Sequence, residues 1–106
     1  MDKERLEALL EEATVDCYGE HEEFAGVMCT LGDELRFPLR ATVVGEPVKV
    51  VGIDERRSGL RRGIVARVRR GGQEHRVGLA ELEFVDPDPV SAEWLEVYQY
   101  WLSLGG

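Results

Sequence analysis

Apolar residues in the first third of the chain recur at helical spacing and predict two helices. The first helix covers residues 2–17, with Asp2 as a suitable N-cap and Gly19 as a stop or kink. Its apolar positions fall on one face: Leu6, Leu9, Leu10, Ala13 and Cys17. The second helix fits residues 20–31, and Gly32 ends it. Its apolar face has the same spacing: Phe24, Val27, Met28, Leu31 and Leu35.

From residue 37 the pattern changes to the alternation that is typical of strands. Five short strands are predicted, at residues 37–44, 47–54, 62–70, 73–79 and 82–85. In the third strand, Ile64, Ala66 and Val68 share one face, and Gly71-Gly72 indicates a tight hairpin after it. Five short strands joined by tight turns favour a small antiparallel β-barrel of the SH3-like kind.

The last twenty residues predict a third helix, with Asp88 as N-cap and Pro89 at its first position. Its apolar face consists of Val90, Trp94, Val97, Trp101 and Leu104, and Gly105-Gly106 ends it. We expect Trp94, Tyr98 and Trp101 to pack this helix onto the barrel, because aromatic side chains bury large apolar areas.

The fold class is therefore α+β, with two N-terminal helices, a small SH3-like antiparallel β-barrel and a C-terminal helix. We expect one domain over residues 1–106. Within it, residues 1–35 form an acidic helical segment, residues 36–86 the barrel and residues 87–106 the last helix.

Composition favours a soluble cytoplasmic protein. The 106 residues are 43% hydrophobic, which is enough for a core, and no apolar run has the length of a transmembrane helix. The N-terminus lacks the apolar region of a secretory signal. Two cysteines, Cys17 and Cys29, do not make a disulfide framework.

The net charge of −8 is unevenly distributed along the chain. Residues 1–34 carry eleven Asp and Glu against Lys3 and Arg5, residues 36–76 carry eleven Lys and Arg against four acids, and residues 77–106 carry six acids and no base. The acidic ends and the basic middle can attract each other, so total charge does not identify a partner.

Residues 15–39 contain six carboxylates, and helix electrostatics explain only some of them. Glu20, Glu22 and Glu23 lie in the first turn of the second predicted helix, where the helix dipole stabilises each by roughly 0.3–1 kcal/mol. Asp16 lies near the end of the first predicted helix, where a negative charge is unfavourable. It also faces Glu20 and Glu23 if the helix continues through Gly19.

Two readings of this segment remain open from the residues alone: a solvated acidic face, or a cation site. No Lys or Arg occurs in residues 6–35 to offset the charge. Calcium accepts about six to eight oxygen ligands in irregular geometry, and Asp33 and Glu34, in the turn after Gly32, could supply the other side of such a site. The EF-hand loop spacing does not occur.

Zinc is a weaker alternative. Cys17 and His21 lie four residues apart, with Cys29 nearby, but zinc requires three or four such ligands and the chain has no CxxC pair. Buried structural cysteines are the simpler interpretation.

The segment that begins at Asp16 resembles the N-terminal signature of a small bacterial, cyanobacterial-type calcium-binding protein family. The matching positions are Asp16 and Tyr18, followed by Leu31, Asp33, Leu35, Phe37, Pro38 and Ala41. The later segments VGLAELEFVD and WLEVYQYWL are similar to the closing strand and C-terminal helix of the family, so the resemblance spans about residues 12–102.

The resemblance implies calcium binding, as a buffer or sensor, through clustered surface carboxylates on a scaffold that is not an EF-hand. Asp16 and Asp33 match the family signature directly, and Glu20, Glu23 and Glu34 fall in acidic positions around them. These five are the expected Ca²⁺ ligands. The resemblance implies no catalysis, and no Ser–His–Asp set or phosphate loop can be argued from the spacings.

The alternative function is an interaction module whose arginine-rich barrel face binds nucleic acid or an acidic protein. Seven arginines lie in residues 56–70: Arg56, Arg57, Arg61, Arg62, Arg67, Arg69 and Arg70. Aromatic residues that would stack bases are missing from this stretch, which favours a solvated face partly paired with the acidic helices. The expected partners are therefore calcium and a protein, without nucleic acid or membrane.

Overall fold

The computed structural model describes residues 2–105, which divide into two compact units. One unit, the helical unit, consists of Met1–Leu35 and Pro89–Gly106, and the other, the sheet unit, is Arg36–Asp88. One domain over residues 1–106 stays a prediction. None of the helices in the described chain is long and apolar enough to span a membrane.

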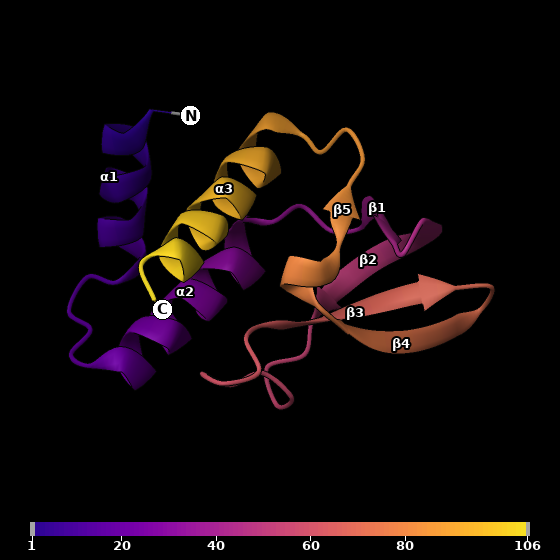
Figure 1. Ribbon diagram of the computed structural model, residues 1–106, viewed down its shortest axis with the longest axis horizontal. Coiled ribbons are helices and arrows are strands. Elements are labelled where there is room, and N and C mark those ends of the chain that lie inside the picture. Colours follow the sequence, from indigo (N-terminus) through magenta and orange to yellow (C-terminus); the bar gives the residue numbers. More distant parts are fainter. Residues whose placement is uncertain (1, 106) are drawn as a thin grey trace. The chain divides into compact units, whose positions relative to one another are not determined.

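The helical unit contains α1 (Lys3–Ala13), α2 (Glu20–Glu34) and α3 (Pro89–Ser103), and each helix contacts the other two (Figure 1). The Asp2 side chain accepts a hydrogen bond from the Glu4 amide, which confirms the predicted N-cap, and Pro89 occupies the first position of α3 as predicted. The core of the unit is formed by buried apolar side chains from all three helices: Leu9, Ala13, Phe24, Val27, Leu31, Leu35, Trp94, Val97, Tyr98 and Trp101.

The predicted C-terminal ends of the first two helices are both wrong, whereas their predicted starts agree with the structure. α1 ends at Ala13 rather than at residue 17, because the chain turns at Thr14, whose hydroxyl donates to the Leu10 carbonyl at 2.8 Å, and because Asp16 adopts a left-handed φ of 60°. α2 continues through Gly32 to Glu34. Burial of Leu31 and Leu35 on either side of this glycine outweighs its helix cost of about 1 kcal/mol.

Gly26 permits the close approach of α2 to the end of α1. A Cβ atom at this position would lie 2.6 Å from the Ala13 carbonyl oxygen and 3.0 Å from Cys17 Sγ. The turn after α1 therefore packs directly against the backbone of α2, which fixes where Asp16 begins its path to the second helix.

Aromatic side chains join α3 to α2. The Trp101 ring lies 5.9 Å from the Phe24 ring, centroid to centroid, and stacks on Tyr98 at 6.4 Å. Trp94 is also buried. The expectation that these aromatics pack onto a barrel stays a prediction.

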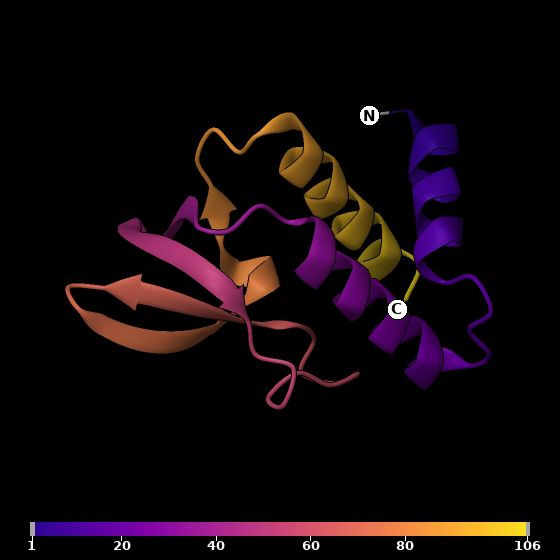
Figure 2. The ribbon, with the colours of Figure 1, turned by 180° about the vertical axis from the view of Figure 1, so that it is seen from behind.

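The sheet unit is one antiparallel sheet in the order β4-β3-β2-β1-β5. Its strands are β1 (Leu39–Val43), β2 (Glu46–Ile53), β3 (Val65–Arg70), β4 (Gln73–Gly78) and β5 (Glu83–Phe84), with a short 3₁₀ helix, η1 (Leu79–Glu81), before β5. All five predicted strands are present. The loop between β2 and β3 extends beyond the sheet (Figure 2).

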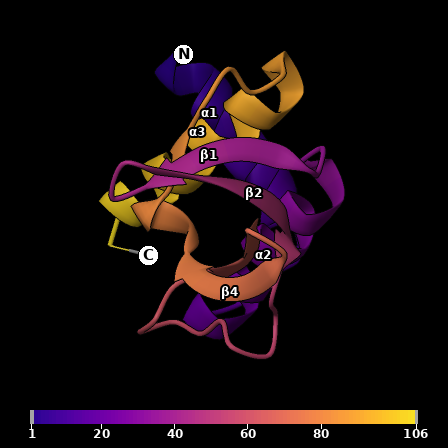
Figure 3. The same ribbon diagram turned by 90° about the vertical axis from the view of Figure 1, so that its right-hand side faces the viewer.

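The sheet curves strongly, with β4 facing back toward β1 and β2 (Figure 3). In the described chain, the outer strands β4 and β5 are not paired with each other, so a closed barrel is not confirmed. Ile64, Ala66 and Val68 are almost fully buried, as the alternation predicted.

Two-residue turns connect the hairpins. Gly71 and Gly72 have φ values of 57° and 85°, which confirms the predicted turn between β3 and β4. Val44 and Gly45 make the equivalent turn between β1 and β2, with φ values of 49° and 78°. A β-branched residue is strained at a positive φ, and Val44 is 97% exposed, so no burial compensates for the strain.

Replacing Val44 with Asn should therefore stabilise the protein by about 1 kcal/mol, because Asn-Gly is the preferred pair for such a turn. Chemical denaturation monitored by circular dichroism measures this change. The exposed Val15, which lies outside any hairpin, is the matched control, and Val15→Asn should have little effect. A loss of stability in Val44→Asn would contradict the assignment of turn strain.

Candidate functional site

The turn between α1 and α2 carries the first group of predicted ligands. Asp16 is exposed in this turn, and Glu20 and Glu23 lie in the first turn of α2. Gly19, at the N-cap, offers no side-chain cap, and Glu22 takes over part of this role by accepting a hydrogen bond from the Tyr18 amide at 3.4 Å. Glu22 is therefore used locally, whereas Glu20 and Glu23 are not.

The second group, Asp33 and Glu34, lies at the other end of the same helix. These residues form the last turn of α2 and not a turn after Gly32, as the sequence had suggested. At 1.5 Å per residue, Asp33 is about 15 Å from Glu23 along the helix axis. The structure therefore does not bring the five predicted residues together, and one ion cannot contact both groups.

All five carboxylates lack a hydrogen-bond or ion-pair partner within residues 2–105. Other acids of the helical unit are engaged: Glu93 pairs with Arg5 at 2.9 Å, and Glu7 accepts a hydrogen bond from the Tyr100 hydroxyl at 3.0 Å. Partial burial, together with Glu7, raises the pKa of Tyr100. Among the acids of this unit, the predicted ligands are thus available to an external cation.

The positions of these carboxylates do not match the coordination that calcium requires. Within the described chain, no group of three or more His, Cys, Asp or Glu side chains lies close enough to hold a metal. Calcium requires about six to eight oxygens, so the carboxylates as they lie do not form a complete site. Zinc is no better served, because Cys17 is half-buried while His21 is exposed.

Two further acids share the same properties and were not predicted. Glu11 and Glu12 are exposed near the end of α1 and have no partner in the described residues. Glu11 lines a shallow groove of about 350 Å³ together with Glu7 and Tyr100. The absence of Lys and Arg from residues 6–35 is the sequence signal that includes these two acids.

Comparison with known proteins gives the family. A family described as calcium binding, CcbP, matches residues 7–102 of the chain. The chain belongs to this family. Calcium binding is therefore its function, and Ca²⁺ is its ligand. This confirms the resemblance that begins at Asp16.

Two solved structures share the fold of this family member. The crystal structure of Anabaena CcbP matches with a TM-score of 0.85 and 23% identity, over 97% of this chain and 93% of that one. A calcium-binding protein in the calcium-binding form matches with a TM-score of 0.78 and 23% identity, over 98% and 93% of the two chains. No curated protein matches the sequence.

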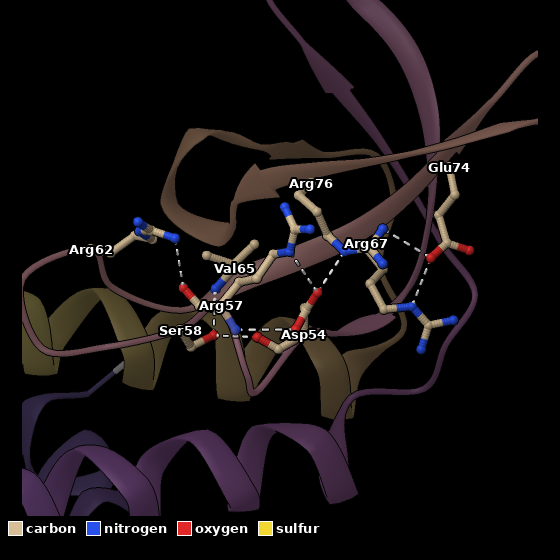
Figure 4. A network of polar contacts seen from close by, with 8 residues as sticks. All are labelled: Asp54, Arg57, Ser58, Arg62, Val65, Arg67, Glu74 and Arg76. Atoms are coloured by element: carbon tan, nitrogen blue, oxygen red, sulfur yellow. Dashed lines mark hydrogen bonds and ion pairs between the residues drawn. The ribbon is translucent and has the colours of Figure 1, made fainter.

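The arginines of this family member are largely paired within the sheet unit (Figure 4). Asp54 contacts Arg76 at 2.6 Å and Arg57 at 3.6 Å. Glu74 contacts Arg76 at 3.0 Å and Arg67 at 3.1 Å. We expected the acidic helices to supply these partners, and the structure instead shows carboxylates on the sheet and its loops. A paired face is the interpretation that the sequence favoured over a nucleic-acid surface.

These pairs lower the pKa values of both carboxyl groups. For Asp54 the main cause is the hydrogen bond from Arg76, with a further contribution from the Arg57 amide. For Glu74 the main cause is the hydrogen bond from Arg67. Because the folded pKa values lie below the unfolded ones, the resulting stability is present above about pH 4 and is lost as the pH falls through the folded values.

Arg76→Gln removes the cation that both carboxylates share and should lower the melting temperature at pH 7. The difference from the native protein should shrink as the pH falls below about 4 and the carboxylates become protonated. Thermal denaturation at pH 7, 5 and 3 measures this. Arg61→Gln, which removes an exposed arginine without an ion pair in the described chain, should show no such trend. An equal Arg76→Gln effect at pH 7 and pH 3 would show that packing, not charge, is responsible.

Proposed function

We propose that this calcium-binding protein holds Ca²⁺ through Asp16, Glu20, Glu23, Asp33 and Glu34, in two separate groups at the two ends of α2. The observation that carries the proposal is the availability of these carboxylates: all five lack a partner in the described residues, in a unit with very few cations. The protein acts as a buffer or sensor and not as an enzyme.

The first group is the stronger of the two. Glu20 and Glu23 lie three residues apart on α2, which places them on neighbouring positions of the helix surface. Asp16 lies in the exposed turn that leads into the helix, four residues before Glu20. Calcium accepts backbone carbonyls and water besides carboxylates, so three carboxylates are enough to begin a site.

In the second group, the electrostatic cost that a cation would relieve comes from the helix dipole. Asp33 and Glu34 lie at the C-terminal end of α2, where the helix dipole disfavours negative charge, and the last turn has no basic residue. A bound cation would relieve this cost. With only two carboxylates, we expect weaker binding here than at the first group, with water as the remaining ligands.

We also propose that the curved sheet of residues 36–88 is an SH3-like barrel and that the protein acts in the cytoplasm. Cys17 and Cys29 form no disulfide in the described chain, which suits a reducing compartment. A protein partner would receive the calcium signal if the protein is a sensor.

Calorimetric titration with calcium at physiological salt tests the ligand assignment. The native protein should release or absorb heat and should melt at a higher temperature in millimolar calcium, because a ligand of the native state stabilises it by mass action. The triple variant Asp16→Asn/Glu20→Gln/Glu23→Gln should lose the tighter binding event. The pair Asp33→Asn/Glu34→Gln should retain it and lose only the weaker one.

Glu83→Gln is the matched control, because Glu83 is an exposed acid of the sheet unit without a partner in the described chain. Without calcium, Asp33→Asn/Glu34→Gln should melt at the same or a higher temperature than the native protein, since it removes charges that the dipole disfavours. Equal calcium binding by all variants would refute the five ligands while leaving the function of the family intact.

A further inference from the structure

The sheet unit carries a groove that calcium binding does not explain. It has a volume of about 430 Å³ and crosses β1, β2 and β3 near the β3–β4 turn. Its charged lining consists only of cations: Arg40, Lys49, Arg69 and Arg70.

Three of these cations form a row across the strands. In the register of the sheet, Arg40 of β1 lies directly opposite Lys49 of β2, and Lys49 lies directly opposite Arg69 of β3. Directly opposite residues project from the same face, with Cβ atoms about 4.5–5.5 Å apart. The row therefore places three positive side chains next to one another on three adjacent strands.

The charges of the groove are only partly balanced by carboxylates. Arg70 pairs with Glu46 at 2.8 Å, and Arg69 has a distant contact of 4.0 Å with Glu74. Within the described residues 36–88, Arg40 and Lys49 have no carboxylate within ion-pair distance. Elsewhere on the sheet, Asp54 and Glu74 neutralise the arginines around them.

Like charges directly opposite each other destabilise a sheet. Long Arg and Lys side chains can be favoured at such positions because they cover apolar surface. Arg40 and Lys49 are both exposed, so this packing does not fully explain why two like charges lie opposite each other. A local arrangement that lowers the stability of the fold, with no compensating contact in the fold, is typical of a binding surface. The missing component is an anion.

We propose that this groove binds an acidic helical segment of a partner protein. Side chains at i and i+4 on a helix have Cβ atoms about 5–6 Å apart, which matches the spacing of the cation row. A helix lying across the strands can therefore present successive carboxylates to Arg40, Lys49 and Arg69. The planar guanidinium groups at both ends of the row suit carboxylate ligands.

Nucleic acid fits this groove less well. No aromatic side chain lines it, so bases have nothing on which to stack. The sheet unit carries eleven Lys and Arg against eight Asp and Glu, and the whole chain has a net charge of −8. The chain as a whole is therefore negative and repels anions at long range. This repulsion is stronger for a phosphate backbone, which carries many closely spaced charges, than for a short acidic peptide.

The test uses the full-length protein and a labelled synthetic helical peptide with Glu at i, i+4 and i+8. Fluorescence anisotropy at low salt should show binding that weakens as salt is added. An isomeric peptide of equal charge, with its glutamates on different faces, should bind about tenfold more weakly. Arg40→Gln/Lys49→Gln should reduce binding of the aligned peptide by about tenfold or more.

The matched control is Arg56→Gln/Arg61→Gln, which removes two exposed arginines of the β2–β3 loop that have no partner in the described chain. It should change binding by less than about twofold if the row, not total charge, is responsible. Melting curves provide a second readout: Arg40→Gln/Lys49→Gln should melt at the same or a higher temperature, because it removes repulsion.

Four outcomes would overturn the proposal. They are equal binding of the two peptides, an equal loss in both double variants, tighter binding of a single-stranded oligonucleotide than of the aligned peptide, and a lower melting temperature for Arg40→Gln/Lys49→Gln. Self-association of the protein that the same pair abolishes would assign the groove to a second copy instead. Calcium binding should be unchanged in both variants, so this test is independent of the ligand assignment above.

Discussion

The helical unit has far more carboxylates than cations, and its electrostatics depend on this imbalance. Residues 1–35 contain eleven Asp and Glu, and the only basic residues there are Lys3 and Arg5. Arg5 is already engaged with Glu93. Within residues 2–105, the other carboxylates of α1, α2 and the turn between them have no ion pair, so water or a bound cation must stabilise them. Membership of a calcium-binding family identifies the cation.

The sheet unit has more basic than acidic residues, and carboxylates of the same unit pair with many of its arginines. Two of its carboxylates lie between arginines: Asp54 contacts Arg57 and Arg76, and Glu74 contacts Arg67 and Arg76. Among the described strand residues, Arg40 and Lys49 lie directly opposite each other and have no such ion pair. Exposed charges without an ion pair in the described chain are thus mostly carboxylates on α1 and α2, and they are cations in the groove. Each exposed set is suited to a different ligand.

Most of the fold could be predicted from local pattern, whereas the candidate site could not. Asp2, Gly71-Gly72 and Pro89 mark their elements correctly because capping, turn and helix-start preferences act over a few residues. Gly32 misled the prediction, because burial on both sides of it carries α2 on to Glu34, three residues past the predicted end at residue 31. Asp33 therefore lies in the helix, and the length of α2 separates it from Asp16. Sheet closure and ligand distances depend on long-range geometry, which periodicity does not encode.

The central claim is that calcium is held at the two ends of α2. Two-dimensional amide NMR of the ¹⁵N-labelled protein during calcium titration tests it most directly, because it locates binding without any substitution. We expect shifts to concentrate at residues 14–23 and, at higher calcium, at residues 32–36, while β3 and β4 remain unchanged. Shifts centred on the sheet unit, or saturable binding with no change around Asp16, would contradict it.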